Sequence, residues 1–194
     1  MAKDEEMIPR AEAVKAVALT CRRLGMLHLA FAMTLVKEFG EEKGEELTTK
    51  AIKEYGRMIG EKKKEQALEQ GADLTLETFR KLSDLPALGM HSGRGEAMVE
   101  DEKRARVYGC VMSQVWQDYG QEKLGRIYCY VDPASTMAFS PDFKYVHTRA
   151  IPDGDEYCEL VFRPATAQDR EELGKEKTDF RVIEEGKVGK GDDR

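Results

Sequence analysis

Three cysteines and one aspartate in the second half of the chain have residue types and spacing that could do chemistry: Cys110, Cys129, Asp132 and Cys158. If residues 127–132 are helical, Cys129 and Asp132 lie three positions apart on one face, whereas in a strand they point to opposite faces. A thiol beside a carboxylate could act as nucleophile and proton acceptor, or both could bind a metal ion. Because free cysteines are most often buried packing residues, the spacing leaves a structural role open.

Pro133 follows Asp132 directly and predicts the end of that helix. The thiol and the carboxylate would then lie at a helix C-terminus, where the helix dipole disfavours a thiolate. This placement counts against easy activation of Cys129 as a nucleophile.

A β-hairpin is predicted within residues 144–163, because two alternating runs flank a short Asp-Gly loop. The expected register places Arg149 opposite Cys158 and His147 opposite Leu160. Such a face could line a pocket for a small polar or anionic ligand, although an ordinary mixed hairpin face is the alternative, and a one-residue change in register breaks the cluster. The residues expected on this face are Tyr145, His147, Arg149, Cys158, Leu160 and Phe162.

Two further histidines have a structural and a functional interpretation. His28 lies on the apolar stripe of the first predicted helix, as a core or interface residue or as a general base that reaches the same pocket. His91 lies in a predicted Gly-containing loop, residues 91–95, which forms the surface or a lid. The sequence contains no HExxH, zinc-ribbon, GxSxG or P-loop motif.

Helices are expected to fill the first half of the chain. Apolar residues recur at spacings of three and four over 8–39, and residues 24–36 are apolar on nearly every face, which predicts burial in the core or in a homodimer interface. A second helix is predicted over 42–70, with residues 61–65 as a solvated charged face. Thr75 could cap a short helix that ends at Lys81. The expected apolar side of the second helix is Leu47, Ala51, Tyr55 and Met58.

The second half of the chain has sequence patterns that differ from those of the helical first half. Residues 104–112 read as a strand, and 113–132 as helix interrupted near two glycines, before the predicted hairpin. Helices followed by a small antiparallel sheet predict a single α+β domain over 1–164, with a helical part of about 8–90 and a strand and helix part of about 100–164. Residues 165–194 are expected to be a charged, partly disordered tail, with one edge strand around Phe180, Val182 and Ile183.

Composition limits the class of protein. A chain of 194 residues with 41% apolar residues can bury a sizeable core. A net charge of −6 argues against a nucleic-acid or anionic-membrane partner. The run at 24–36 is shorter than the roughly 20 residues that span a membrane, and the acidic start predicts no signal peptide. Four scattered cysteines are typical of free thiols in a reducing cytoplasm.

Three segments in this order resemble one known family. They are residues 53–60 with Tyr55-Gly56 and a second glycine at 60, Cys110 followed by a helix and residues 128–132, and the hairpin end at 154–162. This arrangement resembles the L-2-amino-thiazoline-4-carboxylic acid hydrolase family, which is distantly similar to small-molecule-binding domains of the 4-vinyl reductase type. The resemblance covers roughly residues 8–164.

The resemblance implies hydrolytic opening of a cyclic amidine to an N-carbamoyl amino acid, which we expect here as hydrolysis of a carbon–nitrogen bond in a small substrate. The family-like cysteines are Cys110, Cys129 and Cys158, and the acid is Asp132. Cys129 or Cys110 could attack directly, thiolates with Asp132 could hold a divalent metal that activates water, or Asp132 could pair with the amidinium. The alternative is a non-catalytic domain that binds a small molecule or a metal ion.

Two residues of the hairpin receive expected roles in this reaction. His147 is expected to transfer protons. Arg149 is expected to bind a substrate carboxylate, beside Tyr145 and Cys158.

Overall fold

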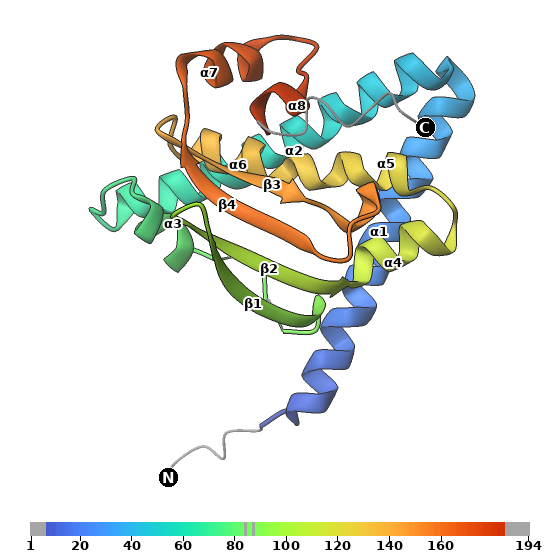
Figure 1. Cartoon of the computed structure of the whole chain (residues 1–194), viewed down its shortest axis with the longest axis horizontal. Coiled ribbons are helices and arrows are strands. Elements are labelled where there is room, and N and C mark those ends of the chain that lie inside the picture. The colour runs from blue at the N-terminus through green and yellow to red at the C-terminus, as the bar shows by residue number, and fades with distance from the viewer. Residues whose placement is uncertain (1–6, 84, 87, 185–194) are drawn as a thin grey trace.

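A four-stranded antiparallel sheet forms the second half of the fold, and helices pack around it (Figure 1). The computed structural model of the chain describes residues 7–83, 85–86 and 88–184. The strands lie side by side in the order β1-β2-β4-β3, with bounds β1 (His91–Val99), β2 (Glu102–Cys110), β3 (Phe143–Arg149) and β4 (Cys158–Pro164).

Helices precede, interrupt and follow the sheet, so the predicted α+β class is confirmed. The two long helices and the capped short helix agree with the sequence patterns, and Thr75 accepts a hydrogen bond from the Thr78 backbone N–H as an N-cap. The bounds are α1 (Arg10–Phe39), α2 (Glu41–Glu69), α3 (Leu76–Lys81), α4 (Val111–Asp118), α5 (Glu122–Arg126), the 3₁₀ turn η1 (Ile127–Tyr130), α6 (Val131–Phe139), the 3₁₀ turn η2 (Ile151–Asp153), α7 (Ala167–Gly174) and α8 (Phe180–Ile183).

The predicted loop at residues 91–95 is wrong, because β1 begins there. β1 pairs with β2 from His91 opposite Cys110 to Val99 opposite Glu102. The polar and glycine-containing sequence gives little strand signal of its own, so the hydrogen-bond ladder to β2 determines the conformation.

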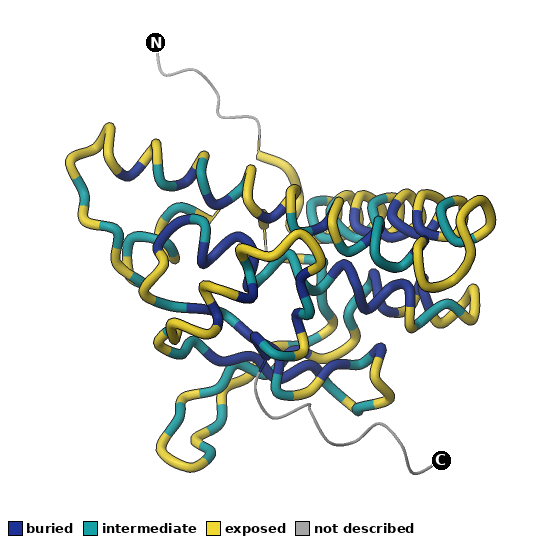
Figure 2. The backbone as a smooth tube through the Cα atoms, turned by 90° about the horizontal axis from the view of Figure 1, so that it is seen from above, coloured by how far each residue is buried: buried dark blue, intermediate teal, exposed yellow. Residues whose placement is uncertain are grey.

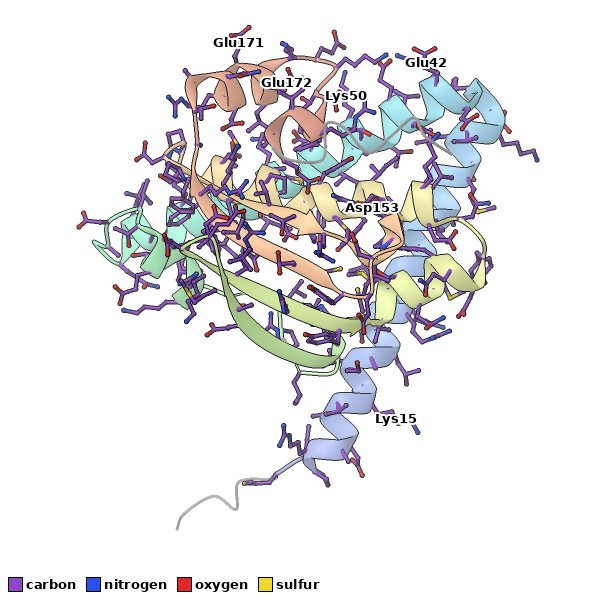
Figure 3. All side chains as sticks on the ribbon, in the orientation of Figure 1. Lys15, Glu42, Lys50, Asp153, Glu171 and Glu172 are labelled. Carbon is purple, nitrogen blue, oxygen red and sulfur yellow. The ribbon has the colours of Figure 1, made fainter. Side chains whose placement is uncertain are left out.

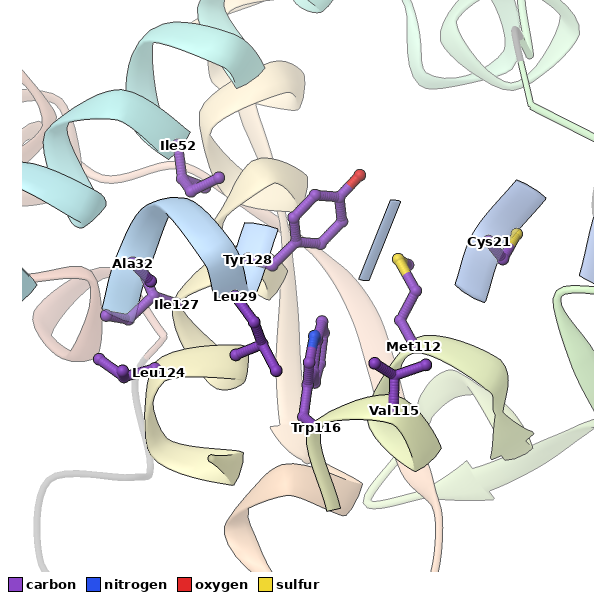
Figure 4. Close-up of a cluster of buried hydrophobic side chains, with 10 residues drawn as sticks. All are labelled: Cys21, Leu29, Ala32, Ile52, Met112, Val115, Trp116, Leu124, Ile127 and Tyr128. Carbon is purple, nitrogen blue, oxygen red and sulfur yellow. The ribbon is translucent and has the colours of Figure 1, made fainter. Parts of the chain in front are cut away.

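The main hydrophobic core lies between α1, α2 and the helices that follow β2 (Figure 4). Figure 2 shows buried stretches inside the fold and exposed residues on the outer sides of the long helices and at the loops. The members of this core are Cys21, Leu29, Ala32, Ile52, Met112, Val115, Trp116, Leu124, Ile127 and Tyr128.

One side of α1 is buried and the other is exposed. The expectation that residues 24–36 are buried on nearly every face is therefore wrong within this chain, since Leu27 is 55% and Phe31 65% exposed. A homodimer through this helix stays a prediction. The buried side is Cys21, Gly25, His28, Leu29 and Ala32.

Within the described residues, α1 has the length and composition of a membrane-spanning helix. Its 18-residue window reaches a mean hydropathy of 1.2, and 28% of that window is buried in the fold. Core helices of globular domains and signal sequences share these two properties, so they do not identify a membrane helix. The expected absence of a membrane partner stays a prediction.

Small residues, rather than the predicted apolar ones, form the buried side of α2. Of the expected apolar side, Tyr55 is 36% and Met58 59% exposed. Glycine lets neighbouring backbones approach: a Cβ on Gly44 would lie only 2.4 Å from the Val36 Cα of α1. The buried residues of α2 recur at intervals of three or four, as Gly44, Thr48, Ile52, Gly56, Gly60, Lys63 and Ala67.

Replacing Gly60 with alanine is expected to lower the free energy of unfolding by about 1–3 kcal/mol, the usual cost of overpacking. The new Cβ would lie 2.2 Å from the Ser135 carbonyl oxygen of α6, so the two helices must move apart. Urea denaturation measures the loss. Gly174→Ala is the matched control, because no heavy atom lies within 4 Å of its Cβ position. Equal stability of both variants would contradict this account.

The expected edge strand near the C-terminus is wrong, since α8 occupies that place. Phe180 and Ile183 are buried, and the Tyr130 ring stacks on Phe180 with centroids 4.7 Å apart. The buried Lys144 ammonium binds Asp169 and donates to the Ile183 carbonyl at 2.8 Å. Residues 165–184 are therefore packed on the domain instead of forming a free tail, while the rest of the predicted tail, 185–194, lies outside the described residues.

Candidate functional site

The hairpin brings three of the expected site residues to one face of the sheet. His147 pairs with Leu160 as predicted, and Tyr145 pairs with Phe162 and stacks on its ring with centroids 4.0 Å apart. Side chains alternate along a strand, so Cys158 shares the face of Leu160 and Phe162 on β4. His147, Tyr145 and Cys158 therefore share one sheet face with Leu160 and Phe162, as predicted.

The predicted position of Arg149 is wrong. An irregularity between His147 and Arg149 shifts the register, so Arg149 pairs with Glu159 and not with Cys158. Its exposed guanidinium lies 5.5 Å from the Tyr157 ring centroid. A bulge of this kind has no signal in the alternating pattern from which the register was predicted.

Cys129 and Asp132 lie in consecutive helical turns, η1 and α6, which confirms the helical alternative for this pair. The predicted helix end at Pro133 is wrong, because Pro133 is the third residue of α6. Proline is accepted there, since the first backbone N–H groups of a helix have no acceptor within the helix. Asp132 therefore lies at a helix N-terminus, where the dipole favours a carboxylate.

The imidazole of His147 lies between two carboxylates. Its Nε2 is 3.8 Å from an oxygen of Asp132, and its Nδ1 is 3.5 Å from an oxygen of Glu184. The side chains of His147 and Glu184 are 5% and 1% exposed, whereas that of Asp132 is 35% exposed. Asp132 is thus the member of this trio that solvent and a solute can reach.

Burial among protein atoms raises the pKa of Asp132, and the charge of Glu184 raises it further. His147, Arg126 and Lys63 act in the opposite direction. The helix N-terminus contributes only about 0.3–1 kcal/mol toward the charged form, while desolvation of a carboxyl can be several times larger. The raised pKa makes Asp132 a better proton acceptor than an ordinary aspartate.

Arg126 is a buried cation beside the trio. It donates to Glu184 through one terminal nitrogen and to Asp153 through Nε at 3.0 Å. Its guanidinium carbon lies 4.9 Å from the Tyr130 ring centroid. Figure 3 labels Asp153 in the turn between β3 and β4, beside α5. Sequence reasoning missed Arg126 and Glu184, because polar residues in a charge-rich chain give no sign of burial.

The three candidate thiols lie near one another but are not gathered as a ligand set. Burial raises the pKa of Cys129 well above its usual value, Arg126 lowers it, and negative charge on Cys158 or Cys110 would raise it further. Cys158 is buried, and Cys110 and Cys129 are half-buried. Among the residues that the structure describes, no three His, Cys, Asp or Glu side chains are placed to hold a metal ion. We therefore derive no step through the divalent metal that the sequence left open.

Iodoacetamide is expected to leave Cys129 unmodified in the native protein near neutral pH. Its raised pKa keeps the thiol protonated, and the thiolate is the reactive form. Peptide mapping after labelling at several pH values measures the rate. The urea-unfolded protein is the control and should be labelled readily. Rapid modification of native Cys129 at pH near 6 would instead identify a thiolate nucleophile.

Lys63 is a buried cation close to this region, although residues 61–65 were predicted to be a solvated face. It is 9% exposed, and its ammonium lies 4.6 Å from the Phe79 ring centroid. Its charge lowers the pKa of Asp132. Lys63 comes from the buried side of α2 that packs on α6.

Two arginines lie near Tyr145 and were missed by the sequence analysis. Arg80 of α3 lies 4.7 Å from the Phe162 ring centroid, and Arg94 of β1 pairs with Val107 of β2. Burial raises the pKa of Tyr145, and the charges of Arg94 and Arg80 lower it. The interpretation of residues 91–95 as a loop hid the strand position of Arg94.

The other two histidines lie apart from the trio. His28 is a core residue whose Nε2 is 2.8 Å from the Leu124 carbonyl oxygen, and burial lowers its pKa. This contact supports the structural interpretation. His91 starts β1, and burial lowers its pKa to about 4.

An open groove of about 790 Å³ lies on the other side of Arg126, between α2, α5 and α8. Its lining includes Arg126 and Tyr130 but neither Asp132 nor His147. Charged side chains line both sides and pair across it, as Lys123 does with Glu45 and Lys50 with Glu176. Its chemistry is that of a solvated seam between helices, so we place the candidate site at Asp132 and His147.

Fold and geometry define an α+β protein in which sheet and helices meet at a carboxylate–imidazole pair that solvent reaches from one side. The family model for L-2-amino-thiazoline-4-carboxylic acid hydrolase matches residues 22–162, and the chain belongs to that family. The match includes Cys110, Cys129, Asp132 and His147 and ends before α7 and α8. No curated protein and no solved structure gives a significant match.

Proposed function

We propose that this protein hydrolyses a small cyclic amidine of the L-2-amino-thiazoline-4-carboxylate type. The observation that carries the proposal is the pair of Asp132 and His147, 3.8 Å apart, inside the region matched by the family model. Hydrolysis of an amidine carbon needs proton transfer to and from the reacting atoms, which a carboxylate and an imidazole supply near neutral pH.

The product determines which bond breaks. In a 2-amino-thiazoline, one ring carbon bears the sulfur and both nitrogens. An N-carbamoyl product retains both nitrogens on that carbon, so the carbon–sulfur bond breaks, rather than the carbon–nitrogen bond expected from the sequence. Water adds its oxygen to the carbon, the ring nitrogen takes one of the two water protons, and the departing sulfur takes the other by way of the protein to become a thiol.

In this reaction Asp132 accepts the proton from water and hands it to Nε2 of His147, which passes it on to the sulfur. We propose water rather than Cys129 or Cys110 as nucleophile, because the raised pKa of Cys129 opposes thiolate formation. Tyr145 and Cys158 contact the substrate. Arg94 and Arg80, through their charges near Tyr145, replace Arg149 as partners for the substrate carboxylate.

The test is to incubate the purified full chain with L-2-amino-thiazoline-4-carboxylate and to follow the appearance of a free thiol and of N-carbamoyl-cysteine. Catalysed appearance of both supports the proposal. Saturable thermal stabilisation by the same compound without product would instead support the non-catalytic binding domain. We also propose a cytoplasmic protein without nucleic-acid or membrane partners, on the grounds of its charge and free thiols.

A further inference from the structure

A buried carboxylate reaches His147 from a part of the chain that the family match does not cover. Glu184 follows α8, 22 positions beyond the end of the match at residue 162. Its side chain is 1% exposed. One carboxylate oxygen accepts a hydrogen bond from the His147 backbone N–H at 3.3 Å and lies 3.5 Å from Nδ1 of the same residue. The other oxygen accepts a hydrogen bond from Arg126.

The segment that carries Glu184 is held firmly against the sheet. Phe180 stacks on Tyr130, and the interplanar angle is 10°. Lys144, the second residue of β3, donates to the Ile183 carbonyl oxygen one residue before Glu184. These contacts fix the carboxylate relative to the imidazole, as a positioning group requires.

We propose that Glu184 is the positioning residue of His147. It holds the imidazole in the tautomer with a proton on Nδ1, so that the lone pair on Nε2 is directed at Asp132. This inference rests on the proposed function for the role of His147 in proton transfer.

The charges around the imidazole support this tautomer. Glu184 faces Nδ1 and Asp132 faces Nε2, while Arg126 neutralises Glu184. Asp132 has a raised pKa and is 35% exposed, so it is the group of the two that can hold and exchange a proton. The 3.5 Å contact with Nδ1 is not a formed hydrogen bond, and Glu184, which is paired with a guanidinium that always carries its proton, is the acceptor that an Nδ1–H would use.

The isosteric variant Glu184→Gln tests whether Glu184 determines the tautomer of His147. A guanidinium only donates hydrogen bonds and carries a full charge, so the amide oxygen of glutamine is expected to face Arg126, and the hydrogen bond from the His147 backbone N–H is lost. The amide NH₂ then faces Nδ1 of His147 and donates to it. The variant is therefore expected to reverse the tautomer and move the proton to Nε2.

The experiment is nitrogen-15 NMR of the imidazole rings in the full chain without ligand, and His147→Gln assigns the His147 signals. His28 is an internal reference for the opposite tautomer, because its Nε2 lies 2.8 Å from a carbonyl oxygen and must donate. Wild type is expected to show the Nδ1–H form of His147, and Glu184→Gln the Nε2–H form. Glu172→Gln is the matched control: Glu172 is also buried, in α7 (labelled in Figure 3), but binds Lys175 and the Asp179 backbone.

An Nε2–H tautomer in the wild-type protein overturns the proposal even if the variant does not fold. An unchanged tautomer in folded Glu184→Gln, or an equal change in Glu172→Gln, overturns it as well. The readout needs no substrate, so it is independent of the hydrolysis assay. Lack of turnover in a wild type that shows the expected tautomer would refute the proposed function alone.

Discussion

Asparagine in place of Asp132 is expected to reduce kcat/KM for hydrolysis of L-2-amino-thiazoline-4-carboxylate by about 100-fold or more. The amide cannot accept the proton of the attacking water, and general acid–base catalysis contributes about 10²–10⁴ in rate. Steady-state kinetics on both proteins measures the loss. Asp118→Asn is the control, because Asp118 lies on α4, is 44% exposed and pairs with Arg22. Loss of activity in both variants, or in neither, would contradict the assignment.

The pH dependence of kcat/KM is a second test of the role of Asp132 as proton acceptor. Burial raises the pKa of Asp132, so kcat/KM of the wild type should rise with pH with a midpoint above the ordinary aspartate value. Asp132→Asn should lack this rise.

As pH rises, the free energy of unfolding of the wild type should fall while its activity rises. The folded carboxyl binds its proton more tightly than the unfolded one, so the wild-type free energy of unfolding falls as pH rises from the unfolded to the folded pKa. The asparagine variant avoids this fall. It should therefore be at least as stable as wild type near neutral pH, which excludes unfolding as the cause of its lost activity.

Glutamine in place of His147 is expected to lower kcat by about 100-fold while KM changes little. The amide keeps polar contacts to Asp132 and Glu184 but cannot carry a proton between water and sulfur. Kinetics at several substrate concentrations separates the two constants. His91→Gln is the control, because His91 starts β1 outside the trio and should keep activity of the wild-type order. A large rise in KM with unchanged kcat would assign His147 to binding instead of proton transfer.

The sequence patterns predicted the hairpin that carries His147 and the helical pairing of Cys129 with Asp132. Both depend on local spacing: alternation around a short turn, and a separation of three residues in a helix. The predicted end of the helix was wrong. Pro133 was interpreted as the residue that ends a helix, although proline is also common in the first turn of a helix. That error placed Asp132 at the wrong end of a helix.

The features that sequence reasoning missed depend on tertiary packing. The buried side of α2 was predicted from the spacing of apolar residues, which leaves glycine out. The side with Gly56 and Gly60, which contacts α6, was therefore not recognised. Glu184 lies in a charge-rich segment whose burial depends on a few anchors such as Phe180. The displacement of Arg149 results from a one-residue irregularity that no composition rule marks.

The most direct test of the central claim is a product analysis of the reaction in oxygen-18 water. Wild-type protein is expected to convert L-2-amino-thiazoline-4-carboxylate to N-carbamoyl-cysteine with one labelled oxygen and one free thiol per turnover, and Asp132→Asn is expected to yield almost none. Mass spectrometry of the product and a thiol titration measure both. Release of ammonia with the ring still closed, or no turnover by the wild-type protein, would contradict the account.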